Sequence, residues 1–156
     1  MKEILKITVF IVASEFAGII GSVFTFSSIP TWYASLNKPV FSPPNWIFGP
    51  VWTILYALMG ISAYLIWEKG IKNKEAISAL KLFIIQLILN SLWSILFFGL
   101  HSPALAFFEI IILWVFIVLT VIRFYRLVKA AGYLLLPYLF WVTFASFLNL
   151  SIILLN

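Results

Sequence analysis

Five long runs of apolar residues alternate with short polar connections along the chain. The runs cover residues 7–26, 46–67, 82–100, 104–122 and 133–155. A helix needs about 20 mostly apolar residues to cross the hydrocarbon layer of a bilayer, and each run is about that long. The pattern therefore predicts an all-α protein, in which residues 1–156 form a single domain, an integral membrane bundle of five transmembrane helices.

The composition supports a membrane protein. Hydrophobic residues make up 64% of the chain and charged residues 10%, whereas soluble domains are about half apolar and about a quarter charged. The first run has a competing interpretation, because Lys2 and Lys6 precede it and "VAS" before Glu15 resembles a signal-peptidase site. The run continues well past that point through "EFAGIIGSVFTF", which favours an uncleaved first helix.

The basic residues are distributed unevenly between the two sides of the predicted bundle. Of the ten Lys and Arg residues, nine fall on the side of the N-terminus and only Lys38 falls on the other side. Because cytoplasmic segments carry the excess of Lys and Arg, we expect a cytoplasmic N-terminus and an external C-terminus. The net charge of +5 then reflects topology and anionic lipid headgroups, and no nucleic-acid partner is expected.

A proline-rich segment, "KPVFSPPNWIFGPVW", connects the first two runs at residues 38–52. It holds four of the seven prolines of the chain. Proline fixes φ and removes a backbone donor, so the segment is a poor helix interior and predicts a stiff, pre-shaped loop. The charge distribution places this loop on the outer face.

Three of the runs carry stripes at helical spacing that mix aromatic rings with amide or small side chains. The stripes are Trp52, Tyr56, Met59 and Ala63; Gln86, Asn90, Trp93 and Phe97; and Tyr138, Trp141, Ala145 and Leu148. A single stripe is more typical of ordinary bundle packing. Three together favour a cavity with apolar aromatic walls and few hydrogen-bonding groups, which is typical of a site for a flat small molecule.

Two carboxyl groups lie within the apolar runs. Glu15, near the middle of the first run, predicts either a ligand or proton contact in a cavity or a carboxyl that holds helices together. Glu109, near the outer end of the fourth run, is expected to snorkel toward the headgroups. The chain has one histidine, His101, and no cysteine, so no metal site and no cofactor is predicted.

The first run also has a side of small residues that includes Gly18 and Gly21. Small residues let helix backbones approach closely in a membrane. This side is equally consistent with a dimer face and with close packing inside the bundle.

Residues 32–60, "WYASLNKPVFSPPNWIFGPVWTILYALMG", closely resemble the signature of the tryptophan-rich sensory protein and translocator protein family, TspO/MBR, formerly called peripheral-type benzodiazepine receptors. The resemblance extends to "QLILNSLWSILFFG" in the third run and "PYLFWVTFASFLN" in the fifth. It implies a bacterial cell-membrane protein, often a homodimer, that binds tetrapyrroles such as protoporphyrin IX and haem, and benzodiazepine-site ligands. Sterol binding is not expected, because the end of the fifth run lacks the tyrosine and basic residue of the animal members' cholesterol pattern.

The resemblance also implies a pocket among the helices, capped by the first loop. Carried over by position, its ligand-binding residues are Tyr33, Pro44, Trp52, Tyr56, Asn90, Trp93, Trp141 and Ala145. Some bacterial members are expected to promote light-dependent oxidative degradation of protoporphyrin IX. The sequence holds no acid–base or nucleophilic constellation, so such chemistry would depend on the porphyrin, with Trp52 and Trp141 as the catalytic rings. The alternatives are a non-catalytic tetrapyrrole sensor and a transporter.

Overall fold

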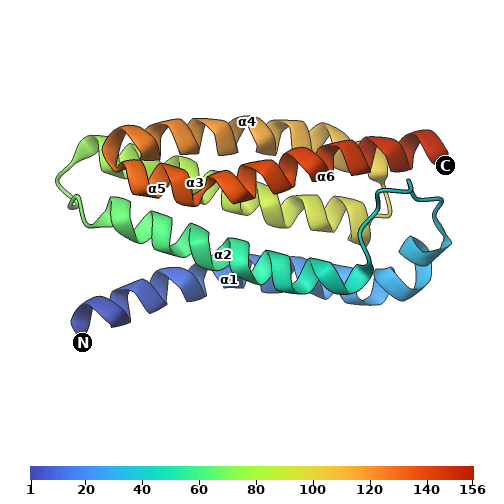
Figure 1. The fold of residues 1–156 in the computed structure, drawn as a ribbon, viewed down its shortest axis with the longest axis horizontal. Coiled ribbons are helices and arrows are strands. Elements are labelled where there is room, and N and C mark those ends of the chain that lie inside the picture. The colour runs from blue at the N-terminus through green and yellow to red at the C-terminus, as the bar shows by residue number, and fades with distance from the viewer.

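The computed structural model describes residues 1–156 as a bundle of helices without strands (Figure 1). Helix α1 (Lys2–Ser28) continues into the π-helical turn η1 (Ile29–Tyr33), and α3 (Lys74–Ser94) continues into a second such turn, η2 (Ile95–Gly99). The other helices are α2 (Asn45–Trp67), α4 (Pro103–Leu127), α5 (Lys129–Leu134) and α6 (Leu136–Leu155). Five helical segments are long and apolar enough to cross a membrane, which confirms the predicted fold class.

Each predicted run coincides with one of these helical spans, except that Leu100 follows the end of the third span. The spans are Lys2–Tyr33, Asn45–Trp67, Lys74–Gly99, Pro103–Leu127 and Lys129–Leu155. The helices are longer than the runs because their polar ends continue the backbone hydrogen-bond ladder beyond the apolar residues. The chain is thus an integral membrane protein.

The proline-rich segment is only partly a loop. Helix α2 begins at Asn45, with Pro44 as its N-cap residue, and it includes Pro50. Pro44 precedes the first turn, where backbone N–H groups have no helical partner, so its missing donor costs little there. Pro50 lies inside the helix and removes the donor that would bond the Trp46 carbonyl. The helix thus begins one residue before the predicted span at 46–67, and the expectation of a stiff loop holds only for the part of residues 38–52 that precedes Asn45.

The fifth span is interrupted between α5 and α6. Leu135 separates the two helices, and Pro137 lies in the first turn of α6. Proline cannot donate the bond that would continue a single helix through this point. Two helix starts carry side-chain caps: Asn73 accepts from the backbone N–H groups of Glu75 and Ala76 at the start of α3, and Ser102 accepts from that of Leu105 at the start of α4.

Helices α1 and α2 pass close together at Gly60, which has no side chain to separate their backbones. A Cβ atom at Gly60 would lie 2.5 Å from Ile11 Cα, nearer than real Cβ atoms come. Gly132 of α5 meets Tyr125 of α4 in the same way, at 2.5 Å from its Cβ atom. Hydroxyl groups bind across other contacts, such as Ser91 Oγ to the Ala17 carbonyl at 3.0 Å. Small residues therefore set the helix spacing, as expected in lipid.

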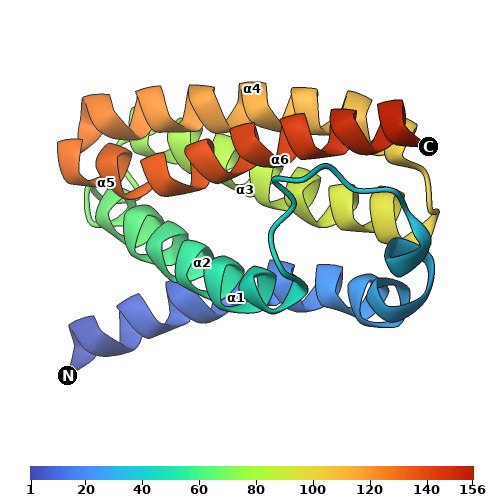
Figure 2. The same ribbon diagram turned by 45° about the vertical axis from the view of Figure 1, so that its right-hand side comes forward.

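The bundle has two ends, which Figure 1 shows at left and right. We call the end with the N-terminus and the 68–73 connection the N-terminal end. We call the end with the 34–44 connection, the 100–102 connection and the C-terminus the loop end. Figure 2 shows the 34–44 connection crossing beside α3 and α6 at the loop end.

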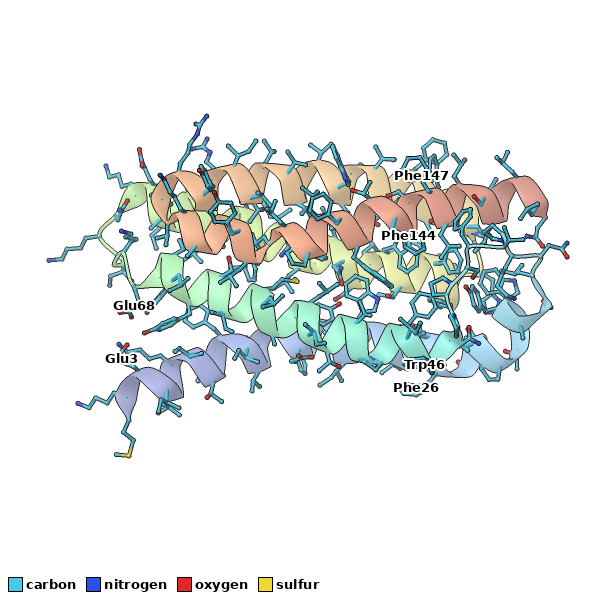
Figure 3. All side chains as sticks on the ribbon, in the orientation of Figure 1. Glu3, Phe26, Trp46, Glu68, Phe144 and Phe147 are labelled. Atoms are coloured by element: carbon cyan, nitrogen blue, oxygen red, sulfur yellow. The ribbon has the colours of Figure 1, made fainter.

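A polar cluster joins α1 and α2 at the N-terminal end, where Figure 3 shows Glu3 and Glu68 near one another. Lys6 Nζ lies 2.9 Å from Glu3 Oε1 and 3.6 Å from Glu68 Oε1. The Tyr64 hydroxyl donates a hydrogen bond to Glu3. These charges are exposed, as suits the polar edge of a membrane bundle rather than its core.

Candidate ligand-binding cavity

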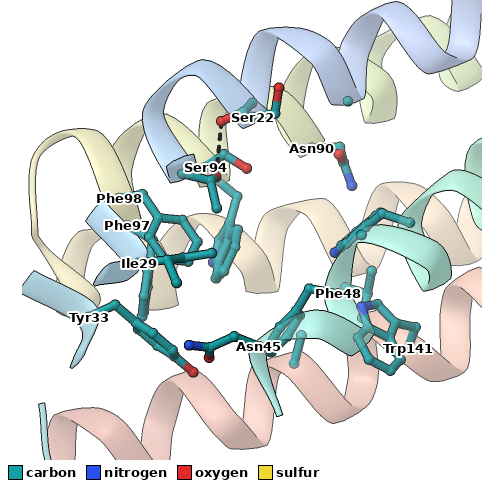
Figure 4. Close-up of a pocket in the computed structure, with 18 of the residues that line it drawn as sticks. Ser22, Ile29, Tyr33, Asn45, Phe48, Asn90, Ser94, Phe97, Phe98 and Trp141 are labelled. Atoms are coloured by element: carbon teal, nitrogen blue, oxygen red, sulfur yellow. Dashed lines mark hydrogen bonds between the residues drawn. The ribbon is translucent and has the colours of Figure 1, made fainter. Parts of the chain in front are cut away.

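A cavity of about 500 Å³ lies at the loop end of the bundle. Helices α1, α2, α3 and α6 form most of its wall, and α4 contributes Ile110 and Leu113. Figure 4 shows Tyr33, Phe48, Asn90, Phe97 and Trp141 around this space, on elements that are far apart in sequence. The volume falls in the range of about 300–1,000 Å³ that is usual for small-molecule sites.

The structure brings seven of the eight predicted ligand-binding residues to this one cavity. They are Tyr33, Trp52, Tyr56, Asn90, Trp93, Trp141 and Ala145. Pro44 does not line the wall; it is the residue before α2, next to Asn45, which does. Its fixed φ suits the turn from the loop into the helix, so its place is structural in this conformation.

The three predicted stripes are divided between the cavity and the core. Trp52 and Tyr56 line the cavity, whereas Met59 and Ala63, further along the same stripe, are fully buried in the packed core. A helical stripe runs the whole length of the bundle, but a cavity occupies only part of that length. The pattern therefore marks the correct face without marking where the cavity ends.

A chain of buried polar side chains closes the cavity floor. The Tyr56 hydroxyl donates to Asn90 Oδ1, and Asn90 Nδ2 donates to the Tyr138 hydroxyl at 2.9 Å. The Tyr138 hydroxyl in turn donates to Gln86 Oε1 at 2.8 Å. All four side chains are buried, so these bonds fix the Asn90 amide and the Tyr56 ring before any ligand arrives.

Aromatic rings form the wall of the cavity toward the loop end. Trp93 stacks on Phe97 with ring centres 4.9 Å apart, and Tyr33 packs against Phe97 and Phe98. The Trp93 indole N–H donates to Asn149 Oδ1 at 3.1 Å, which holds the ring in place. This wall is formed mainly by aromatic rings, and the stacking and the hydrogen bond hold Trp93 in one orientation.

Trp52 and Trp141 differ from Trp93 in one respect. Trp52 packs against Tyr56 at 5.4 Å between ring centres, and Trp141 packs against Phe48 at 6.1 Å. Neither indole N–H forms a hydrogen bond with another protein group, although Trp93 and Trp114 both do. Trp52 and Trp141 therefore offer indole N–H groups without a protein partner at the cavity wall, as does Trp46 at the exposed edge of that wall.

Glu15 lines the cavity and forms neither a hydrogen bond nor an ion pair with the protein. This placement favours the cavity interpretation of Glu15 over a role in holding helices together.

The expectation that Glu109 snorkels toward the headgroups is wrong. Its side chain is only 6% exposed, because it lies on the face of α4 that also buries Ala106 and Ile110.

The small side of α1 packs within the bundle. A Cβ at Gly18 would lie 2.4 Å from Tyr56 Cε2, and one at Gly21 would lie 2.9 Å from Ser94 Oγ. Gly18 and Gly21 thus provide room for the cavity wall, which settles the choice between bundle packing and a dimer face for these residues.

The connection between η1 and α2 is fastened to the end of α6. The Asn37 backbone N–H donates to Asn156 Oδ1 at 2.9 Å, and Asn156 Nδ2 donates back to the Asn37 carbonyl at 3.0 Å. Lys38 Nζ donates to the carbonyls of Tyr33 and Leu36 at 2.8 and 3.0 Å. Phe41 packs edge-on against Phe144. The connection is therefore held over the loop end.

His101 also binds within the loop end. Its ring stacks on Trp32 with centres 4.5 Å apart, and its Nε2 lies 3.1 Å from Ser28 Oγ. This histidine joins the 100–102 connection to the end of α1 and to η1, and it does not line the cavity.

Sequence reasoning missed several lining residues. Asn149 follows Ala145 by one helical turn, so extending the α6 stripe would have found it. Ile110 and Leu113 of α4 are ordinary apolar residues and carry no signal in the sequence.

The fold and cavity define a five-helix membrane protein with an internal aromatic site. The sequence profile of the TspO/MBR family matches residues 10–155, and the chain belongs to that family. It is 50% identical over 154 residues to the tryptophan-rich protein TspO of Archaeoglobus fulgidus, covering 99% of both chains. It is 38% identical over 141 residues to the translocator protein of Bos taurus, covering 90% of this chain and 83% of that protein. With the tryptophan-rich sensory protein of Cereibacter sphaeroides it shares 38% identity over 125 residues, 80% of this chain and 77% of that one.

Proposed function

We propose that this protein binds tetrapyrroles such as protoporphyrin IX, and drug-like benzodiazepine-site ligands, in the loop-end cavity. The observation that carries the proposal is the convergence of seven predicted residues on one aromatic cavity of about 500 Å³. A flat conjugated ring would stack on Trp93 and its neighbours, as aromatic faces do. The Trp52 and Trp141 indoles would donate to the polar groups of the ligand.

Each residue has a part in this proposal. Tyr33, Trp93 and Ala145 shape the wall, and Tyr56 and Asn90 form the polar floor. Pro44 acts indirectly, by fixing the turn that leads from the capping loop into α2.

We further propose that the bound porphyrin undergoes light-dependent oxidation, with Trp52 and Trp141 as the reactive rings. The porphyrin absorbs the light and dissolved dioxygen is the oxidant, so the protein needs no cofactor of its own. The two indoles at the wall would act as electron carriers, because indole is more easily oxidised than phenyl: an indole gives an electron to the excited porphyrin, which passes it to dioxygen, and the indole radical is restored by an electron taken from the porphyrin. The net change is that the porphyrin is oxidised and dioxygen is reduced.

The test separates binding from turnover. The purified protein is titrated with protoporphyrin IX in the dark, where we expect saturable binding, and the complex is then illuminated. A new absorbing product that requires the protein supports the reaction. An unchanged spectrum after illumination leaves a tetrapyrrole sensor or, if porphyrin crosses vesicle membranes that contain the protein, a transporter.

We propose that the N-terminus lies in the cytoplasm and the loop end lies outside, because nine of the ten Lys and Arg residues fall on the side of the N-terminus. A reporter that works only outside the cytoplasm, fused at Asn156, should be active. Reporter activity confined to the cytoplasm would reverse the topology.

We also propose that the protein forms a homodimer, because of the family resemblance. Since the Gly18 side of α1 is occupied within the bundle, another face must form the contact between the two subunits.

A further inference from the structure

We propose that the cavity opens sideways into the membrane, between the loop-end halves of α1 and α2. The ligand would enter through this opening from the lipid, and not from water through the loop. The proposal rests on the proposed binding function and adds the route by which a membrane-dissolved ligand reaches the site.

The exposed residues of the cavity wall all belong to two helices. Ile19 and Phe26 of α1 are 58% and 78% exposed, and Trp46 of α2 is 73% exposed. Gly49 and Thr53 of α2 are exposed as well, as is Asn45 at its start. In contrast, every lining residue from α3, η2, α4 and α6 is buried or half-buried. The wall is therefore open on one side only.

The spacing of α1 and α2 explains the opening. The helices are in close contact at Gly60 and Gly18, where an added Cβ would lie 2.5 Å from Ile11 and 2.4 Å from Tyr56. At Gly49 an added Cβ would meet no atom within 4 Å. The space beside Gly49 is therefore open, and Gly49 belongs to the wall of the cavity.

The rim of the opening is suited to lipid. The Thr53 hydroxyl donates to the Gly49 carbonyl at 3.0 Å, and the Ser22 hydroxyl donates to the Ile19 carbonyl at 2.7 Å. These rim hydroxyls are satisfied within their own helices, and both flanking backbones are helical. An opening in the hydrocarbon layer is tolerated only where polar groups are satisfied in this way.

The route from water is closed in the same structure. Asn37 and Asn156 exchange hydrogen bonds between the loop and the end of α6, and Lys38 binds the carbonyls of Tyr33 and Leu36. Ligand that entered from this side would have to break these bonds. A ligand in the membrane would have none of these bonds to break at the opening.

Substitutions at the two routes test the proposal. Gly49→Phe places a ring in the open space of the rim, and Thr53→Leu narrows the same rim one turn further along. Ile54→Phe is the matched control, because Ile54 is exposed on the same helix and does not line the cavity. Asn156→Ala loosens the loop. Each protein is placed in lipid nanodiscs, and protoporphyrin IX association is followed in the dark by stopped-flow quenching of tryptophan fluorescence.

We expect Gly49→Phe to slow association by about tenfold and Thr53→Leu to slow it less. Association slows because the narrowed rim must change conformation before the ligand can pass. Ile54→Phe and Asn156→Ala should associate at the rate of the unmodified chain. Faster association of Asn156→Ala, with both rim variants as fast as Ile54→Phe, would overturn the sideways route. Absence of saturable dark binding by the unmodified chain would instead overturn the proposed function, and the route with it.

Discussion

The two ends of this bundle use the same helices in opposite ways. At the N-terminal end, Gly60, Ala63 and Ala79 let the helices meet so closely that Met59 and Ile66 are fully buried. At the loop end, the rings of α2, α3 and α6 stand around a cavity of about 500 Å³. The N-terminal end is a packed core, whereas the loop end encloses a cavity.

The difference shows what small residues do in each setting. Gly60 faces the α1 backbone and removes an obstacle to contact, whereas Gly49 faces open space and leaves a gap. The packed end supplies the stability that lets the other end remain hollow, since a void forgoes the dispersion contacts of a filled core. We infer that stability and ligand binding depend on separate parts of the chain.

The same substitution at Gly60 and Gly49 tests whether the two ends differ in packing. Gly60→Leu should destabilise the bundle by about 3 kcal/mol or more, because backbone atoms of Ile11 and Phe10 occupy the space it needs. Gly49→Leu should be neutral or stabilise by up to about 1 kcal/mol, since leucine is the better helix former. Thermal unfolding in one detergent measures both. Equal losses would show that the loop end is packed as tightly as the other.

A second pair of variants distinguishes a residue that lines the cavity from a residue that only belongs to the buried hydrogen-bond network behind it. Asn90→Ala and Tyr138→Phe each leave buried hydrogen-bonding groups without partners, so each should cost about 1–3 kcal/mol of stability. Only Asn90 lines the cavity. We therefore expect Asn90→Ala to weaken dark binding of protoporphyrin by about 1–3 kcal/mol more than Tyr138→Phe does. Equal affinities of the two variants would assign Asn90 to helix packing.

The smallest expected change in affinity concerns the two free indoles. Trp52→Phe and Trp141→Phe keep a ring at the wall, so dark binding should weaken by about 1 kcal/mol or less. The light-dependent product should nevertheless be lost, since the easily oxidised ring is gone. The comparison is made at saturating porphyrin, so that affinity and turnover are separated. Full product formation by both variants would remove the indoles from the reaction.

Much of this architecture could be predicted from the sequence because its signals are local. Apolar runs mark the spans, and the positions of Trp52, Asn90 and Trp141 within their helices mark the face that lines the cavity. The bond between Asn37 and Asn156 could not be predicted, because it joins residues far apart in the chain that carry no pattern. The burial of Glu109 was missed because its distance from the span end suggested lipid headgroups, whereas its helix face decided its environment.

If the loop-end cavity is the tetrapyrrole site, a larger side chain inside it should weaken the binding of protoporphyrin IX in the dark. Ala145→Leu adds three carbon atoms at a lining position of α6. Protoporphyrin IX is titrated against tryptophan fluorescence in the unmodified chain and in this variant, with thermal unfolding as the check on the fold. We expect saturable binding by the unmodified chain and affinity at least about tenfold weaker in Ala145→Leu, a difference of about 1.4 kcal/mol, with the unfolding midpoint unchanged. Equal saturable binding by both proteins would place the porphyrin outside the cavity.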